Sequence, residues 1–238
     1  MTDFRIRVLK TVIKQYPAVV PYLTGRARWM AMALKAEEYK TYDFFLQNVE
    51  RMIESVYNGF LGGEFIDLMA NVISGQLTQA YQQAFADEGF TDFILPPYLQ
   101  SSLESLILSQ YDHVDGLYRD IVDARVDGTP IEPLLVRAQL WAGRWTEAYN
   151  EAVRLIAVEM GGRLIWKLGA TEKHCSSCSA LNGIIAFASE WDELGVAPQG
   201  APNSALECGG WKCDCSLSST TQRRTPKAYD AIIAAVSR

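Results

Sequence analysis

The chain has 238 residues, of which 49% are hydrophobic and 21% are charged, and its formal net charge is -6. A chain of this length and composition can bury a sizeable core, which argues against an intrinsically disordered protein. No apolar run approaches the roughly eighteen residues of a membrane span, and the first residues lack the apolar core and cleavage site of a secretory signal. We therefore expect a globular protein without a membrane span, made in a reducing cytoplasm.

The charged residues are spread unevenly along the chain. Residues 1–60 carry nine basic and six acidic residues, residues 61–160 carry five and fifteen, and residues 161–238 carry eight and seven. Phosphate binding needs a basic surface, so the acidic middle argues against a nucleic-acid-binding face in that part of the chain. We expect these acidic side chains to form solvated helix surfaces.

Helical periodicity dominates the first 160 residues. In three long segments, apolar residues recur at steps of three and four, which places them on one stripe of a helix. These segments are residues 65–84, 99–121 and 134–156. Shorter helical patterns cover roughly residues 3–15 and 42–57. The stripes predict the core of a helical bundle, with His113 as a surface histidine among acidic neighbours.

The pattern changes at Gly161 and Gly162, because two successive glycines can end a helix and let the backbone turn. Residues 163–169 and 184–189 predict two short strands, joined through a tight turn at Asn182 and Gly183. Residues 211–217 predict a third strand, and a short helix begins at Pro226.

The predicted fold class is therefore α+β, with a mainly α-helical N-terminal bundle and a small C-terminal Cys-rich β-module. The predicted domains are a helical domain at residues 1–160, the Cys-rich β-module at residues 161–220 and a C-terminal helix or tail at residues 221–238.

All five cysteines lie in the Cys-rich module. Cys175 and Cys178 form a C-x-x-C pair, which lets two sulfurs approach one ion from a tight turn. Cys213 and Cys215 point to the same side of the predicted strand, because side chains alternate along a strand. Zn²⁺ prefers four thiolate or imidazole ligands in a tetrahedron, so these four cysteines are the first-choice site. Cys208 is the alternative member of the second pair.

Stability also favours a metal, and we expect about one Zn²⁺ per chain. A small module with three short strands buries little apolar surface, whereas a structural zinc supplies roughly 10 kcal/mol or more of folding free energy. His174 could replace one of the sulfurs. Three alternatives remain open: reduced thiols without metal, disulfides formed after release from a cell, and a nucleophilic Cys175 activated by His174.

Three segments of the C-terminal part form a recognisable series: "WKLGATEKHCSSCSALNG", "EWDELGVAPQGAP" and "LECGGWKCDCSL". Together with the preceding helical segment they resemble the phage head morphogenesis, or minor head protein, family related to the Mu F-like proteins. The resemblance covers roughly residues 134–220. The matching positions are a strand tryptophan, the C-x-x-C pair, a turn, a loop tryptophan and a closing C-x-C pair: Trp166, Cys175, Cys178, Leu181, Gly183, Trp191, Cys213 and Cys215.

The resemblance implies a non-enzymatic structural protein of a tailed-phage particle, found in the virion head or connector and in the host cytoplasm during assembly. The implied partners are the portal protein, the major capsid protein or both, with several copies in a particle and a role in head assembly and in DNA packaging or ejection. The chain departs from the common family pattern at Cys208 and the following Gly-Gly-Trp, where many relatives have a His-Pro segment. The fourth metal ligand therefore stays open.

The alternative function is a zinc-module nucleic-acid-binding protein that contacts packaged DNA. Four basic residues near the module could contact phosphates: Lys212, Arg223, Arg224 and Lys227. Four charges give only modest, salt-sensitive affinity for nucleic acid. An enzyme is not expected, and no residue is predicted to be catalytic. The sequence has no Gly-rich phosphate loop, no H-E-x-x-H and no G-x-S-x-G motif.

Overall fold

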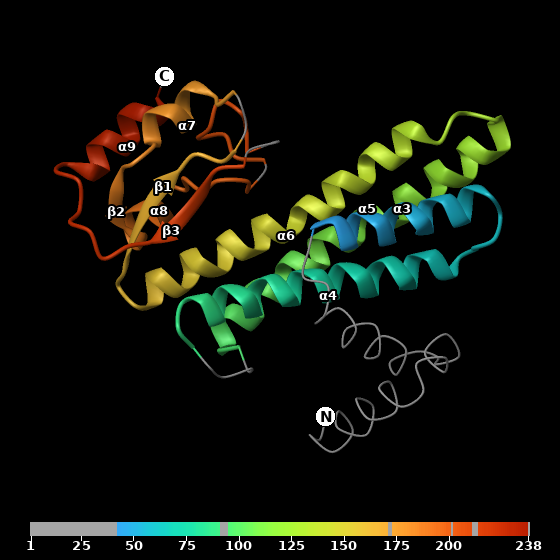
Figure 1. Cartoon of the computed structure of the whole chain (residues 1–238), viewed down its shortest axis with the longest axis horizontal. Coiled ribbons are helices and arrows are strands. Elements are labelled where there is room, and N and C mark those ends of the chain that lie inside the picture. Colours follow the sequence, from blue (N-terminus) through green and yellow to red (C-terminus); the bar gives the residue numbers. More distant parts are fainter. Residues whose placement is uncertain (1–41, 91–94, 171–172, 201, 211–213, 238) are drawn as a thin grey trace, which may run out of the picture. The chain divides into compact units, whose positions relative to one another are not determined.

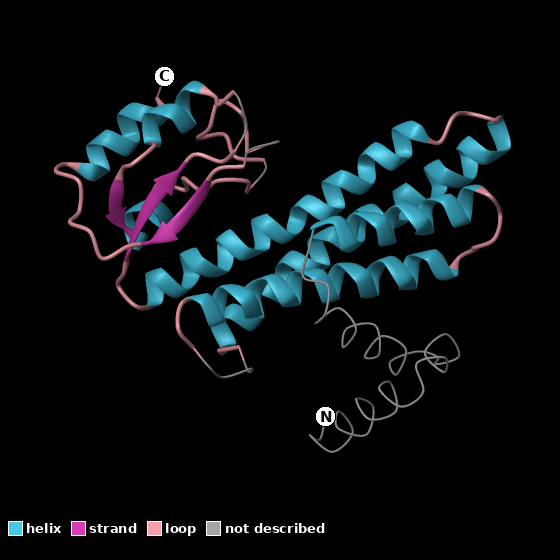
Figure 2. Cartoon of the chain, viewed as in Figure 1, coloured by secondary structure: helices cyan, strands magenta, loops and turns pink. Residues whose placement is uncertain are grey.

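The structure, a computed structural model, describes residues 42–90, 95–170, 173–200, 202–210 and 214–237 (Figure 1). Within these residues the chain is mostly helical and contains one small antiparallel sheet, so the predicted α+β class is confirmed (Figure 2). The helix predicted at residues 3–15 lies outside the described residues. So do two residues of the predicted metal and DNA sites, Lys212 and Cys213.

Four helices lie in the described residues between 42 and 159, and they confirm the helical patterns at residues 42–57, 65–84, 99–121 and 134–156. Their bounds are Tyr42–Tyr57 for α3, Glu64–Asp87 for α4, Pro97–Asp127 for α5 and Glu132–Glu159 for α6. The apolar stripes are largely buried. Fully buried members include Phe65, Leu77, Leu99, Leu117 and Ala152.

The chain divides into two compact units. The first contains the described residues up to Gln76 together with Tyr111–Ala142, and the second contains Leu77–Gln110 and Gly143–Arg238. Helices α4, α5 and α6 therefore each contribute residues to both units. The change from helix to strand falls elsewhere, at Gly161, which has a positive φ of 63° and ends α6 as expected for a glycine at that position.

The first unit is held together by apolar packing and by a buried polar contact. Phe65 of α4 stacks on Tyr118 of α5, with their ring centroids 5.8 Å apart. Gln76 is only 1% exposed, and its side-chain amide donates a hydrogen bond of 2.7 Å to the carbonyl oxygen of Ala142. This bond satisfies a polar group that would otherwise be costly to bury.

The second unit contains the three-stranded sheet, in the order β2-β1-β3. Its strands are β1 (Arg163–Lys167), β2 (Ile185–Phe187) and β3 (Ser216–Ser219), and both pairings are antiparallel. Three short helices accompany the sheet: α7 (Ser176–Leu181), α8 (Ala188–Glu193) and α9 (Ala228–Val236). Helices α7 and α9 lie side by side next to the sheet (Figure 1).

Two tryptophans form the centre of the core beside the sheet. Trp166 of β1 and Trp191 of α8 are both fully buried, and their ring centroids lie 5.8 Å apart. The indole N–H of Trp191 donates to the carbonyl oxygen of Leu164 at 3.3 Å. The residues matched to the strand and loop tryptophans of the family pattern therefore pack against each other.

The strands differ in detail from the prediction. The third strand, β3, begins at Ser216, so Cys215 precedes it, while residues 211–213 of the predicted strand lie outside the described residues. Helix α7 occupies the segment predicted as the tight turn of the C-x-x-C pair, and α8 begins in the segment predicted as the end of a strand. Such six-residue helices depend on tertiary contacts rather than on periodicity, so the sequence pattern does not predict them. At the predicted turn only Gly183 has a positive φ, 79°, while Asn182 takes φ -55° and ψ 125°, a type II turn.

Candidate metal centre

Three cysteines from two separate segments come together next to α7. The Sγ atoms of Cys175, Cys178 and Cys208 all lie within 4.8 Å of one another. Sulfurs bound to one tetrahedral Zn²⁺ at about 2.3 Å lie about 3.8 Å apart, so small side-chain movements bring these three to bonding distance. Among the described residues, these three cysteines form a cluster of His, Cys, Asp or Glu side chains whose ligand atoms lie close enough together to hold one metal ion.

Helix α7 positions the first two sulfurs. Cys175 is its N-cap, with φ -66° and ψ 162°, and its Sγ accepts a hydrogen bond of 3.3 Å from the backbone N–H of Cys178. The backbone N–H of Ser179 donates to the carbonyl oxygen of Cys175 at 3.0 Å. The C-x-x-C spacing therefore forms one helical turn, with Cys175 half-buried and Cys178 only 2% exposed.

A tight loop presents the third sulfur, that of Cys208. The backbone N–H of Asn203 donates to the carbonyl oxygen of Gly209 at 2.8 Å, which closes the loop on itself. The side-chain amide of Asn203 also donates to the carbonyl oxygens of Gly195 at 3.2 Å and Ala197 at 3.0 Å. Gly209 has a φ of 61°, which favours glycine at the residue after Cys208.

The surroundings of Cys175 favour its thiolate form. Burial alone would raise the pKa of the Cys175 thiol, but hydrogen bonds from the backbone and side chains of Cys178 and Cys208 outweigh it and lower the pKa below its usual value. Because thiolates are the form of cysteine that binds metal, this environment suits the donor set of a metal site.

Cys215 lies in a different contact. It is 1% exposed, and its Sγ lies 4.0 Å from Nδ1 of the half-buried His174. The residue before Cys215, Asp214, lies close to the backbone of Gly169. A Cβ added to Gly169 would stand 2.2 Å from the carbonyl oxygen of Asp214. Cys215 and His174 are thus a thiol and an imidazole from two segments that meet at the end of the sheet.

The structure brings three of the five predicted cysteine ligands together. Cys208, the alternative member of the second pair, joins Cys175 and Cys178, while Cys215 contacts His174 and Cys213 lies outside the described residues. His113 is exposed on α5, as expected of a surface histidine. The prediction missed Asn203, since one asparagine in a Gly- and Pro-containing loop carries no distinctive sequence signal.

No protein-family model matches the chain, and separate comparisons with curated proteins and with solved structures found no match. None of the described helices is long and apolar enough to cross a membrane. The fold and the cluster define a mainly helical α+β protein with a cysteine-based site that could hold a metal ion.

Proposed function

We propose that the chain is a non-enzymatic structural protein of a tailed-phage head, in which a zinc-bound C-terminal module docks onto the portal protein or the major capsid protein. The observation that carries this proposal is the convergence of Cys175, Cys178 and Cys208 beside a very small sheet. The segments that bring these sulfurs together are the ones that resemble the minor head protein family.

The metal in this proposal has a structural role. The strands of the sheet have five, three and four residues, so their pairing alone gives limited stability. Structural zinc sites are closed four-ligand sites rich in cysteine, whereas catalytic sites leave one position for water. Three thiolates with a fourth ligand from Cys213, Cys215 or His174 would form a closed site holding one Zn²⁺ per chain.

The charge of the helices suits a docking role with a basic partner surface. On α5, the exposed acidic residues include Asp112, Asp123 and Asp127. We expect such a surface to approach a basic region of a portal or shell subunit, because opposite potentials favour encounter and orientation. The protein would then be present in the host cytoplasm during assembly and in several copies in the virion.

Co-purification tests the docking proposal directly. The full chain is co-expressed with the portal protein or the major capsid protein of the same phage-like element, and purified procapsids and virions are probed for it. We expect a stable complex with one of the two and detection in the particles. Failure to bind either protein, together with absence from procapsids and virions, would contradict the proposal.

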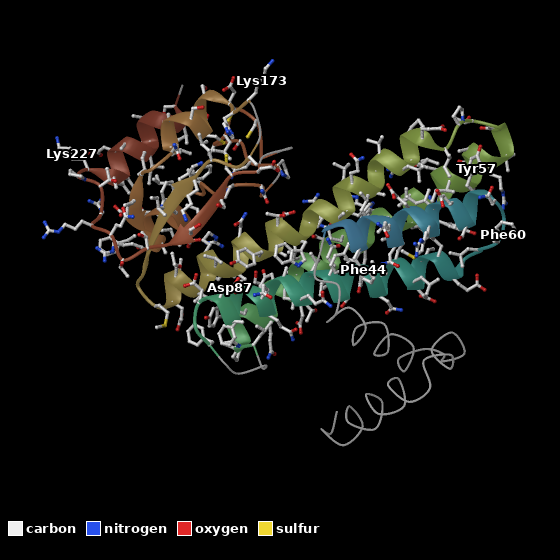
Figure 3. The ribbon with its side chains drawn as sticks, in the orientation of Figure 1. Phe44, Tyr57, Phe60, Asp87, Lys173 and Lys227 are labelled. Carbon is white, nitrogen blue, oxygen red and sulfur yellow. The ribbon has the colours of Figure 1, made fainter. Side chains whose placement is uncertain are left out.

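The nucleic-acid alternative has weaker support. The Arg224 guanidinium is bound to the Glu190 carboxylate, with Nε 2.8 Å from Oε2, so its charge is already partly neutralised. Lys227 is exposed and points away from the module, as does Lys173 (Figure 3). Filter binding at two salt concentrations tests this alternative, since two or three separated cations predict weak retention that disappears at the higher salt.

A further inference from the structure

The two serines between the cysteines of the C-x-x-C pair bind the residue that precedes Cys208. Glu207 Oε2 accepts a hydrogen bond of 2.7 Å from the backbone N–H of Ser176 and one of 2.6 Å from its hydroxyl. The backbone N–H of Glu207 donates in turn to Oγ of Ser177 at 3.1 Å. Three hydrogen bonds therefore join the first turn of α7 to the loop that carries the third sulfur.

We propose that this contact, the Ser–Glu latch formed by Ser176, Ser177 and Glu207, positions Cys208 as a metal ligand and thereby sets the affinity of the site. Glu207 acts as a positioning residue and not as a ligand. Among the described residues, the group of mutually close ligand atoms consists of three thiols and contains no carboxylate. The inference rests on the proposed metal site.

The latch links the residue before Cys208 to α7, whereas the loop's own bonds, such as that from Asn203 N–H to the Gly209 carbonyl oxygen, hold the loop only to itself. Asn203 anchors the start of the loop to the carbonyl oxygens of Gly195 and Ala197, whereas Glu207 anchors it immediately beside Cys208. Cys208 lies thirty residues after Cys178 in the sequence, so bringing the two sulfurs together costs chain entropy. A contact that forms before metal binding removes part of this cost from the binding step.

The chemistry of the latch suits that role. Hydrogen bonds to an ionised carboxylate are shorter and stronger than those between neutral groups, which agrees with the two bonds at 2.6 and 2.7 Å. Ser177 is 4% exposed, so its hydroxyl is a buried group with a fixed partner. In known metal sites, groups that hold ligands in place typically change metal affinity by about 10- to 100-fold when they are removed.

The test measures Zn²⁺ affinity of the full chain by competition with a chromophoric chelator, and the absorption spectrum of the Co²⁺-loaded protein. Glu207→Ala should weaken Zn²⁺ binding by about 10-fold or more and reduce the thiolate-to-cobalt charge-transfer band per bound ion. Glu207→Gln keeps an acceptor oxygen and should recover part of the affinity. Ser177→Ala should weaken binding in the same direction as Glu207→Ala.

Glu193→Ala is the matched control. Glu193 is also an exposed glutamate of the same unit, and its carboxylate accepts a hydrogen bond of 2.9 Å from the Tyr229 hydroxyl, away from the cysteines. Its replacement should leave Zn²⁺ affinity and the Co²⁺ spectrum unchanged. A wild-type chain that binds no Zn²⁺ would contradict the metal site itself. A wild-type chain that binds Zn²⁺, with unchanged affinity and spectrum in Glu207→Ala and Ser177→Ala, would overturn the latch.

Discussion

The helical region (residues 42–159) and the C-terminal region (residues 161–237) reach stability in different ways. Residues on long continuous stripes are buried in α4, α5 and α6, so the core of the helical region is distributed over many similar contacts. The core of the C-terminal region is built from short elements, and alongside its buried apolar residues it contains specific contacts such as the tryptophan pair, the cysteine cluster and the Glu190–Arg224 ion pair. A single substitution should therefore have a larger effect in the C-terminal region than in the helical one.

Loss of a metal ligand should show the largest difference in stability between the two regions. Cys178→Ser should abolish Zn²⁺ binding and remove a contribution of about 10 kcal/mol to the folding of the C-terminal region. The near-ultraviolet circular dichroism of the buried Trp166 and Trp191 should be lost, while most of the far-ultraviolet helical signal remains. Retention of the tryptophan signal in metal-free Cys178→Ser would show that the region folds without the metal.

Removal of one tryptophan should have the next largest effect. Trp191→Ala deletes a fully buried side chain and its hydrogen bond to Leu164, and should lower the free energy of unfolding by about 3–5 kcal/mol. Trp191→Phe keeps much of the packing and should cost less. Chemical denaturation followed by circular dichroism measures both. Equal stability of Trp191→Ala and wild type would contradict the central place of the tryptophan pair.

The same glycine-to-alanine change should have opposite effects in the two regions. A Cβ at Gly169 would stand 2.2 Å from Asp214 atoms, so Gly169→Ala forces backbone movement beside Cys215 and should destabilise the C-terminal region. Apart from the neighbouring backbone of α5 itself, no heavy atom lies within 4 Å of a Cβ added at Gly116, an exposed residue inside α5. Gly116→Ala should therefore stabilise the chain by up to about 1 kcal/mol, because alanine favours helix. Thermal unfolding of both variants compares the two effects.

The Glu190–Arg224 pair should give the smallest effect, visible as a pH dependence. Hydrogen bonds from Arg224 lower the pKa of the Glu190 carboxyl, and burial opposes this only in part. Because the pKa is lowered in the folded state, the ionised Glu190 contributes fully to the free energy of unfolding above its unfolded-state pKa. This contribution is lost as pH falls through the folded-state pKa.

Arg224→Gln should consequently cost about 1 kcal/mol at neutral pH, as expected for a partly exposed ion pair. The difference from wild type should shrink as pH falls from the unfolded-state pKa through the folded-state pKa of Glu190. Urea denaturation of both proteins at several pH values measures it. A difference that grows on acidification would assign the effect to another group.

The contrast between the regions also explains what the sequence could predict. The helix at Tyr42–Tyr57 has the predicted bounds, because a repeat of three and four residues is a local property of the sequence. The strands were located, but α7 and α8 were not predicted as helices. Each has six residues and is stabilised by contacts from distant segments, such as the bond from Arg224 to Glu190 on α8 and the latch on Ser176 of α7.

The candidate site shows the same limit. The C-x-x-C pair was evident from its sequence spacing alone. In the structure this spacing places both sulfurs on the first turn of α7. Spacing favoured Cys213 and Cys215 as its partners; the structure places Cys208 beside the pair, and Cys213 lies outside the described residues. That grouping depends on the loop bonds of Asn203 and on the carboxylate of Glu207, and no periodic pattern in the sequence encodes them.

Native mass spectrometry of the full chain, purified under reducing conditions, tests most directly whether the cysteine cluster binds a metal. We predict about one zinc per wild-type chain, bound with release of protons because the thiols must ionise, and no bound zinc in Cys208→Ser. A wild-type chain without zinc, or a Cys208→Ser chain that retains it, would contradict the account.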